Sequence, residues 1–419
     1  MEYSNVKGTR DILPDETARW HYIENLARRL LHGYGYGELR TPLVEQTQLF
    51  VRTIGSGTDI VEKEMYTFPD KKGRSLTLRP EGTAGIIRSA IENNLCGEGK
   101  ITRLYYIGPM YRYEKPQAGR QREFYQIGAE LIGSREALSD VEVMLLVLDF
   151  FERLKLKGLV LYMNSVGCAG CRPRYAEAVK RGLSDSIKLM CPDCQRRYFL
   201  NPMRMLDCKD EKDRKIIEKT PRIYDYLCDD CSRHLEKVKG SLEEMGIGYE
   251  MDPYMVRGLD YYTKTAFEIK YGKLFPQDTI AAGGRYDTLV ADLGGQNVPG
   301  TGFALGLERL VKAIEMENIA LPSNEKTDVC VVSLGGEALR RGMKVVSALR
   351  KEGMSCVIDL SSRSLKAQMR EASRIKSRYV VIIGDEELRK GKAVLRNMEK
   401  KKQEEINFSK IVSRLSARG

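Results

Sequence analysis

Histidine is scarce in this chain of 419 residues, which contains only His21, His32 and His234. None of the three lies in the polar motifs described below. The sequence therefore offers no histidine-based catalytic triad and no metal site built on two histidines.

Long hydrophobic runs are also missing, since no apolar stretch approaches the roughly 18 residues of a membrane span. The first residues, MEYSNVKGTRD, lack the apolar core and cleavage pattern of a signal peptide. We therefore expect a cytoplasmic, soluble protein with no membrane partner. Its ten cysteines are then thiols or metal ligands rather than disulfides.

The net charge of +11 is concentrated near the end of the chain. Residues 327–419 hold 21 Lys and Arg against 11 Asp and Glu, whereas the rest of the chain holds 48 against 47. A basic module on a neutral body indicates a polyanionic partner, with nucleic acid favoured over membrane. A solvated lysine-rich surface is the alternative.

Hydrophobic periodicity predicts helices and strands in a mixed order. Helices are expected over residues 15–31 and 138–151 and over a segment that contains Glu308 and Arg309. Strands are expected over residues 39–44, 75–78, 103–112, 124–132, 266–271, 279–282 and 302–305. After a polar linker at 321–326, the basic module predicts strands over 329–333, 355–359 and 379–383, with helices over about 337–351 and 364–375. Strands that alternate with helices favour a largely parallel sheet in this module.

Two short stretches read as the wall of a small-molecule pocket. RGLDYY (257–262) and AGGRYD (282–287) each combine an arginine and tyrosine hydroxyls with glycines that let a ligand approach the backbone. Tyrosine-rich strand ends of an ordinary sheet are the alternative for either stretch alone.

The strands over 103–112 and 124–132 flank a polar loop and so predict a long antiparallel hairpin. Strand parity places Phe124, Gln126 and Glu130 on one face. Arg112, Glu114, Lys115, Arg120 and Arg122 lie at the strand end and in the loop. Arginines can hold phosphates and an aromatic face can stack on a base, so this face suits a nucleotide.

Two further motifs place polar groups at helix starts. In LGLERL, Arg309 follows a glycine-rich strand end, where it and the free N–H groups of the first helical turn can face an anion. In RPEGT, Glu81 and Thr83 lie in a turn, and Glu81 either binds an ammonium group or caps the helix that begins near Ala84.

Seven cysteines fall between residues 167 and 246, six of them in the pairs Cys168/Cys171, Cys191/Cys194 and Cys228/Cys231. Three CxxC pairs indicate tetrahedral zinc. If one helix follows Cys171 and a second returns antiparallel after Cys231, the first pair lies about 25 Å from the other two. We therefore predict a structural zinc site of Cys191, Cys194, Cys228 and Cys231. Free thiols without metal are the alternative.

Several of these motifs together carry a family resemblance. LRPEGT, the hairpin from YIGPMYRYE to REFYQIGAE, and GFALGLERL resemble the substrate strand and motifs 2 and 3 of class II aminoacyl-tRNA synthetases. RGLDYY and AAGGRYD resemble the two signatures of the histidyl-tRNA synthetase family within that class. The likeness covers nearly the whole chain, although the better-known members have few cysteines and no metal in the middle region.

The resemblance implies a role for each matching residue. It implies that Arg112 and Arg257 act on the α-phosphate during catalysis and that both also contact histidine. ATP-binding residues are implied to be Arg112, Glu114, Arg120, Phe124 and Arg309. Histidine-binding residues are implied to be Glu81, Thr83, Arg112, Gln126, Glu130, Arg257, Tyr261, Tyr262 and Tyr286.

The resemblance also implies a fold and partners. The expected fold class is α+β, with a class II antiparallel sheet flanked by helices (1–166 and 247–320), a helical Cys-rich insertion (167–246) and an anticodon-binding α/β domain (327–419). The expected substrates are ATP with Mg²⁺, L-histidine and tRNA(His), and the expected assembly is a homodimer. The alternative is an inactive paralogue that serves as a regulatory subunit of ATP phosphoribosyltransferase.

Overall fold

The computed structural model describes residues 3–117, 119–274, 278–321 and 327–416. The chain divides into two compact units, residues 1–321 and 322–419. Residues 322–326 of the expected linker lie outside the described residues. Among the residues that the structure describes, no helix is long and apolar enough to cross a membrane.

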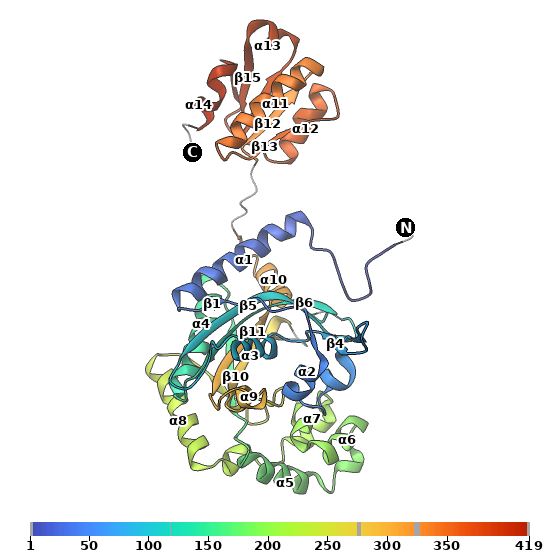
Figure 1. Ribbon diagram of the computed structural model, residues 1–419, viewed down its shortest axis with the longest axis vertical. Coiled ribbons are helices and arrows are strands. Elements are labelled where there is room, and N and C mark those ends of the chain that lie inside the picture. The colour runs from blue at the N-terminus through green and yellow to red at the C-terminus, as the bar shows by residue number, and fades with distance from the viewer. Residues whose placement is uncertain (1–2, 118, 275–277, 322–326, 417–419) are drawn as a thin grey trace. The chain divides into compact units, whose positions relative to one another are not determined.

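The first unit begins with a long helix and continues through short strands to the predicted hairpin (Figure 1). Its elements up to residue 165 are α1 (Pro14–Gly33), β1 (Gly37–Glu38), β2 (Val44–Gln46), α2 (Thr47–Ile54), the π-helical turn η1 (Ile60–Glu64), β3 (Thr67–Pro69), β4 (Ser75–Leu78), α3 (Thr83–Glu92), β5 (Thr102–Tyr111), β6 (Glu123–Ile132), α4 (Ala137–Arg153) and β7 (Leu159–Ser165). The strand expected over 39–44 is wrong, because residues 39–43 belong to no strand. Pro42 lies in this stretch and has no N–H to offer a sheet.

The Cys-rich segment follows β7 and consists of short helices and turns. Its elements are α5 (Cys171–Leu183), η2 (Ile187–Leu189), α6 (Pro192–Leu200), η3 (Pro202–Asp207), α7 (Glu211–Ile217), η4 (Ile223–Tyr226) and α8 (Asp229–Glu244). Figure 1 shows α5, α6 and α7 together at one end of the first unit. Residues of α5 to η4 share a small core of their own, whereas Leu235, Val238 and Leu242 of α8 pack into the main core.

The remaining elements of the first unit complete the main sheet. They are β8 (Glu250–Met251), β9 (Thr263–Tyr271), η5 (Gly272–Leu274), β10 (Thr279–Tyr286), α9 (Leu289–Asp292), β11 (Gly300–Gly306) and α10 (Leu307–Met316). The sheet has eight strands in the order β1-β5-β6-β11-β10-β9-β7-β8, and β2-β4-β3 form a separate small sheet. Pairing in the large sheet is antiparallel except for β1 with β5 and β7 with β8.

Helices α1, α4, α8 and α10 cover one face of the large sheet, and the pocket opens on the other face, where α3 and α9 also pack. Ile127, Ala129 and Leu131 of β6 pack into a core shared with α1, α4, α8 and α10. Phe124, Gln126 and Glu130 of the same strand line a cavity, which confirms the predicted strand parity. The sequence of β6 therefore decides which side chains reach the pocket.

The second unit matches the predicted order of strands and helices. Its elements are β12 (Val329–Ser333), α11 (Gly336–Lys351), β13 (Cys356–Ile358), α12 (Leu365–Arg374), β14 (Tyr379–Ile383), α13 (Asp385–Lys390), β15 (Lys392–Asn397), β16 (Lys402–Asn407), η6 (Phe408–Lys410) and α14 (Ile411–Ser416). Strands β13, β12 and β14 are parallel, and β15 and β16 add an antiparallel edge. The expected largely parallel sheet is therefore parallel in its first three strands only.

Candidate active site

A cavity of about 780 Å³ lies against the pocket face of the large sheet. All thirteen residues predicted for the histidine and ATP sites line it. They are Glu81, Thr83, Arg112, Glu114, Arg120, Phe124, Gln126, Glu130, Arg257, Tyr261, Tyr262, Tyr286 and Arg309. Residues that are up to 228 positions apart in the sequence thus border one space.

A buried carboxylate, Glu130 of β6, stands at the deep end of this cavity. Thr83 donates its hydroxyl to Glu130 Oε1 at 2.6 Å, and the Tyr286 hydroxyl donates to Oε2 at 2.5 Å. Burial raises the pKa of the Glu130 carboxyl to about 8, although these two hydrogen bonds oppose the shift. Gly302 lies opposite Glu130 in the sheet, and a Cβ added there would overlap Glu130 Oε2. Glycine at this position therefore makes room for the carboxylate.

Three tyrosines form an aromatic wall beside Glu130. The ring centroids of Tyr261 and Tyr262 are 4.8 Å apart, and those of Tyr261 and Tyr286 are 5.8 Å apart at a near-perpendicular angle. Burial raises the pKa of all three phenols. The hydroxyls therefore stay protonated and can donate or accept hydrogen bonds.

Glu81 caps the helix α3 and also lines the cavity. Its two carboxylate oxygens accept hydrogen bonds from the backbone N–H groups of Thr83 and Ala84 at 2.7 and 2.8 Å. Burial raises the pKa of the carboxyl against these hydrogen bonds. The two alternatives for Glu81 are thus compatible, because a capping carboxylate also borders the pocket.

Arg257 stands at the side of the cavity in an ion pair with Glu268 of β9. Burial acts to lower the pKa of the guanidinium, but Glu268 and the other acidic neighbours, Tyr262 and Asp207 among them, together outweigh it and the pKa is raised. Its Nε atom is buried and has no hydrogen-bond partner among the residues that the structure describes. This guanidinium therefore keeps unused donor capacity.

Arginines gather toward the other end of the cavity. Arg112 donates from Nε to the Pro80 carbonyl at 2.9 Å, and its guanidinium carbon lies 5.3 Å from the centre of the Phe124 ring. Arg120 forms an ion pair with Glu114 at 3.2 Å. Such a group of guanidiniums beside an aromatic face is suited to a phosphate chain and a base.

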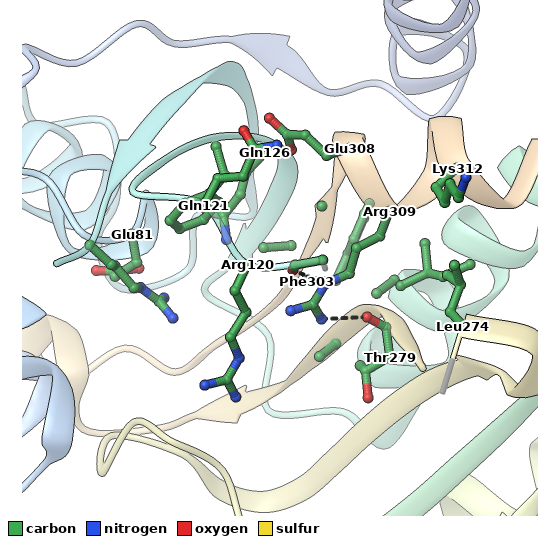
Figure 2. Close-up of a pocket in the computed structure, with 18 of the residues that line it drawn as sticks. Glu81, Arg120, Gln121, Gln126, Leu274, Thr279, Phe303, Glu308, Arg309 and Lys312 are labelled. Atoms are coloured by element: carbon green, nitrogen blue, oxygen red, sulfur yellow. Dashed lines mark hydrogen bonds between the residues drawn. The ribbon is translucent and has the colours of Figure 1, made fainter. Parts of the chain in front are cut away.

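Arg309, near the start of α10, completes this basic end (Figure 2). It donates to the carbonyls of Thr279 at 2.7 Å and Gly119 at 3.1 Å. Burial lowers its pKa, and the nearby charge of Arg120 lowers it further. An anion bound here relieves the repulsion between the two guanidiniums.

Sequence reasoning missed several residues of the site. Glu308 accepts hydrogen bonds from the backbone N–H of Tyr125 at 2.9 and 3.1 Å, and burial raises its pKa to about 7. Tyr106 lines the cavity, and its buried hydroxyl has no hydrogen-bond partner within the described ranges of the chain. The strand pattern of β5 predicts that Tyr106 is buried but does not predict that a pocket lies on that face. No local sequence signal therefore identifies Tyr106 as a site residue.

The arginine of AGGRYD is a correction to the sequence analysis. Arg285 is buried, lies 3.3 Å from Asp140 and donates to the Ser134 carbonyl, and it does not line the cavity. Asp140 also contacts His234 at 2.7 Å. Within this stretch Tyr286 lines the cavity, whereas Arg285 lies outside it and contacts Ser134 and Asp140.

The predicted zinc site is also wrong in its grouping. Cys191 and Cys194 lie with Cys208 and Asp213, whereas Cys228 and Cys231 lie with Cys168 and Cys171. The two-helix geometry failed because α5 ends at Leu183 and residues 184–227 return the chain to the start of α5, where η4 packs. The first and third CxxC pairs therefore meet.

Comparison with known proteins places these features in a family. A model described as "Histidyl-tRNA synthetase" matches residues 8–171 and 203–310, which is more than half of the chain. Histidine–tRNA ligases are 48% identical over 85% of this chain and 85% of the relative in Halothermothrix orenii, and 47% identical over 98% of both chains in Acetivibrio thermocellus. The chain belongs to the histidyl-tRNA synthetase family.

Solved structures of the family agree with the fold. The apo histidyl-tRNA synthetase of S. aureus superimposes with a TM-score of 0.83 at 38% identity and covers 99% of this chain and 100% of its own. A model described as an anticodon binding domain matches residues 328–418. The expected α+β class II fold with a C-terminal α/β domain is therefore confirmed.

Proposed function

We propose that this member of the histidyl-tRNA synthetase family activates L-histidine with ATP and transfers the histidine to tRNA(His). The observation that supports this proposal most strongly is the cavity itself. It contains Glu130, a buried carboxylate that accepts hydrogen bonds from Thr83 and Tyr286, and arginines line another part of it. A carboxylate of this kind recognises the ring N–H of imidazole, and the arginines recognise phosphates.

In this proposal the deep end of the cavity binds histidine. Glu130 accepts a hydrogen bond from one imidazole nitrogen, and the hydroxyl of Tyr262 meets the other. Tyr261 and Tyr286 enclose the ring, and the α-amino group binds at the polar group formed by Glu81, Thr83 and Gln126. The side-chain oxygen of Gln126 is buried, has no hydrogen-bond partner in the described part of the chain and is thus ready to accept a hydrogen bond. An amino acid without ring nitrogens makes neither the hydrogen bond to Glu130 nor that to Tyr262 inside the buried pocket, which costs several kcal/mol of binding free energy relative to histidine.

The basic end binds ATP, which arrives as its Mg²⁺ complex. Phe124 stacks on adenine, and Arg112, Glu114, Arg120 and Arg309 contact the nucleotide. Arg112 reaches both the α-phosphate and the amino-acid carboxylate. Arg257 supplies a second positive charge at the α-phosphate.

The reaction in this site depends on positioning and charge neutralisation. The histidine carboxylate attacks the α-phosphorus, the new oxygen–phosphorus bond forms, and the bond to the β-phosphate breaks to release diphosphate. Because the nucleophile is already an anion, no protein base is needed. Arg112 and Arg257 stabilise the charge on the α-phosphate as the transition state forms.

The basic second unit binds tRNA in this proposal, since tRNA phosphates require a positive surface. We propose further that the protein acts in the cytoplasm as a homodimer. We place residues 39–50 near the dimer interface. These residues include β2 and the start of α2.

The alternative, a regulatory subunit of ATP phosphoribosyltransferase, has less support. A structure from Bacillus halodurans titled as such a regulatory subunit or a histidyl-tRNA synthetase has a TM-score of 0.65 at 22% identity, a likeness of fold alone. The relatives that are nearly half identical to this chain are named histidine–tRNA ligases. The retained Arg112, Arg257 and Arg309 favour the ligase.

Amino-acid-dependent exchange of diphosphate into ATP tests the activation step. We expect exchange with L-histidine that exceeds exchange with each of the other amino acids by at least about 10³-fold. Absence of exchange with histidine, or equal exchange with other amino acids, contradicts the proposal.

A further inference from the structure

The seven cysteines of the Cys-rich segment divide into two separate groups without a remainder. The four-cysteine cluster consists of Cys168, Cys171, Cys228 and Cys231. The three-cysteine cluster consists of Cys191, Cys194, Cys208 and Asp213. In each cluster the four ligand atoms all lie within 4.8 Å of one another.

The sulfur spacings fit a tetrahedral metal site and do not fit a disulfide. Cys168 Sγ lies 3.6 Å from Cys171 Sγ and 3.9 Å from Cys228 Sγ, and Cys191 Sγ lies 3.9 Å from Cys208 Sγ. A disulfide brings two sulfurs to about 2.05 Å. A tetrahedral zinc with bonds of about 2.3 Å to sulfur holds them roughly 3.8 Å apart. The observed separations match the second geometry.

Backbone N–H groups are directed at the candidate ligands of both clusters. The N–H of Cys228 donates to Cys171 Sγ at 3.1 Å, and that of Cys194 donates to Cys191 Sγ at 3.4 Å. The N–H of Cys191 donates to Asp213 Oδ2 at 3.0 Å, and this oxygen lies 3.4 Å from Cys208 Sγ. These donors stabilise ligands in their anionic form, which is the form that binds zinc.

The middle of the segment consists of short elements. Its helices α6 and α7 have nine and seven residues, the 3-10 helix η3 joins them, and the 3-10 helices η2 and η4 flank them. Four of its cysteines, Cys171, Cys194, Cys208 and Cys231, are buried. Buried thiols clustered in small helical modules are a common arrangement for a structural metal that replaces a large hydrophobic core.

We propose that the Cys-rich segment binds two zinc ions, one in the four-cysteine cluster and one in the three-cysteine cluster. The second site has three thiolates and one carboxylate, a donor set that zinc accepts. The family model does not cover residues 172–202, which include Cys191 and Cys194. The proposal does not depend on the activity of the protein.

Each cluster adjoins an arginine that holds the loop with the RGLDYY motif. Arg172 follows Cys171 directly and donates to the Asp260 carbonyl at 3.1 Å. Arg204 lies in η3, which leads into Cys208, and donates to Asp260 Oδ1 and to the Gly258 carbonyl, both at 2.9 Å. Asp260 immediately precedes Tyr261 and Tyr262. In this proposal, zinc binding therefore stabilises the segment from which Arg172 and Arg204 hold this loop.

Metal analysis of the full-length protein tests the proposal. The protein is reconstituted with zinc under reducing conditions, freed of unbound metal and analysed for zinc, iron and protein. We expect two zinc ions per chain. A content of one zinc or less, or iron in place of zinc, overturns the two-zinc proposal.

Three variants assign the ions to the clusters. Cys171→Ser and Cys208→Ser should each retain one zinc per chain, because each removes a ligand from a different cluster. Cys96→Ser is the matched control and should retain two, since Cys96 belongs to neither cluster. Loss of both ions from a single-cluster variant that keeps its native circular dichroism spectrum, or loss of an ion from Cys96→Ser, contradicts two independent sites.

Cobalt substitution gives a second readout that does not require any variant to fold. The protein loaded with Co²⁺ should take up two equivalents and show the intense visible bands of tetrahedral cobalt together with sulfur-to-cobalt charge-transfer absorption. Weak absorption typical of octahedral cobalt would overturn the assignment of thiolate ligands.

Discussion

At the scale of single residues, strand parity and motif chemistry predicted the lining of the pocket. Phe124, Gln126 and Glu130 alternate with core residues on β6, and such alternation can be read from the sequence because side chains of a strand point to opposite faces. The ion pair of Arg257 with Glu268 could not be predicted. This ion pair joins an irregular loop to a strand, and the sequence around either residue does not indicate which residue it pairs with.

Glu130 leads to a prediction about stability and pH. Burial raises the pKa of its carboxyl from 4.5 to about 8 in the folded protein. The unfolded chain therefore loses its proton first, and the folded state loses stability relative to it as the pH rises from about 5 to 8. Glu130→Gln has no such titration. From pH 5 to 8 the free energy of unfolding of the variant, minus that of the parent protein, should therefore increase by up to about 1.4 kcal/mol per pH unit.

Urea denaturation of both proteins at pH 5, 6.5 and 8 measures this difference. The hydrogen bonds of Glu130 that the variant loses change the free energy of unfolding by the same amount at every pH. The test is therefore how the difference between the two proteins changes with pH. A difference between the two proteins that stays constant from pH 5 to 8 contradicts the raised pKa.

Arg257 gives a kinetic prediction. Arg257→Ala should lower the kcat of histidine-dependent exchange by about 10²-fold or more and change the dissociation constant of histidine by less than about fivefold, because the guanidinium acts mainly on charge that develops in the transition state. Glu268→Gln is the control, since it removes the ion pair and keeps the cation, and it should retain most of the exchange. A defect of Arg257→Ala confined to histidine binding is the opposing result.

At the scale of elements, the order of strands and helices was largely predictable, whereas the path of the Cys-rich segment was not. Helices α1 and α4 and strands β4 to β6 follow periodic patterns of apolar residues. The pairing of cysteines depends on where α5 ends and on how residues 184–227 return, and short turns with little periodicity carry no such information. Three CxxC pairs therefore indicated metal chemistry without indicating which pairs meet.

The contact of η3 with the RGLDYY loop yields a prediction at this scale. Arg204→Met should raise the KM for histidine by about 10-fold while the KM for ATP changes by less than about twofold, because the lost ion pair with Asp260 loosens the loop that carries Tyr261 and Tyr262. Arg214→Met, at an exposed position on the neighbouring α7, is the matched control. Equal changes in both KM values, or none, speak against this coupling. The measurement is steady-state diphosphate exchange.

At the scale of the whole molecule, the distribution of charge separates a neutral first unit from a basic second unit. Composition alone indicated this division, because residues 327–419 contain 21 basic and 11 acidic residues. Composition could not predict the antiparallel edge of β15 and β16, which lies beyond the alternating strand and helix pattern of the module.

This charge distribution predicts different salt dependences for the two half-reactions. Raising KCl from 50 to 200 mM should increase the KM for tRNA by at least about 10-fold, because binding releases counterions from the tRNA phosphates. Exchange with histidine at saturating ATP should change by less than about threefold over the same range. Similar salt effects on both reactions would argue against a separate electrostatic site for tRNA.

The formation of histidyl-tRNA tests the central claim most directly. Radiolabelled histidine, ATP and Mg²⁺ are incubated with the full-length protein and total bacterial tRNA, and acid-insoluble radioactivity is counted. The account predicts ATP-dependent charging with histidine that is not reproduced with other amino acids. Absence of charging from a tRNA preparation that another histidine–tRNA ligase charges fully would contradict it.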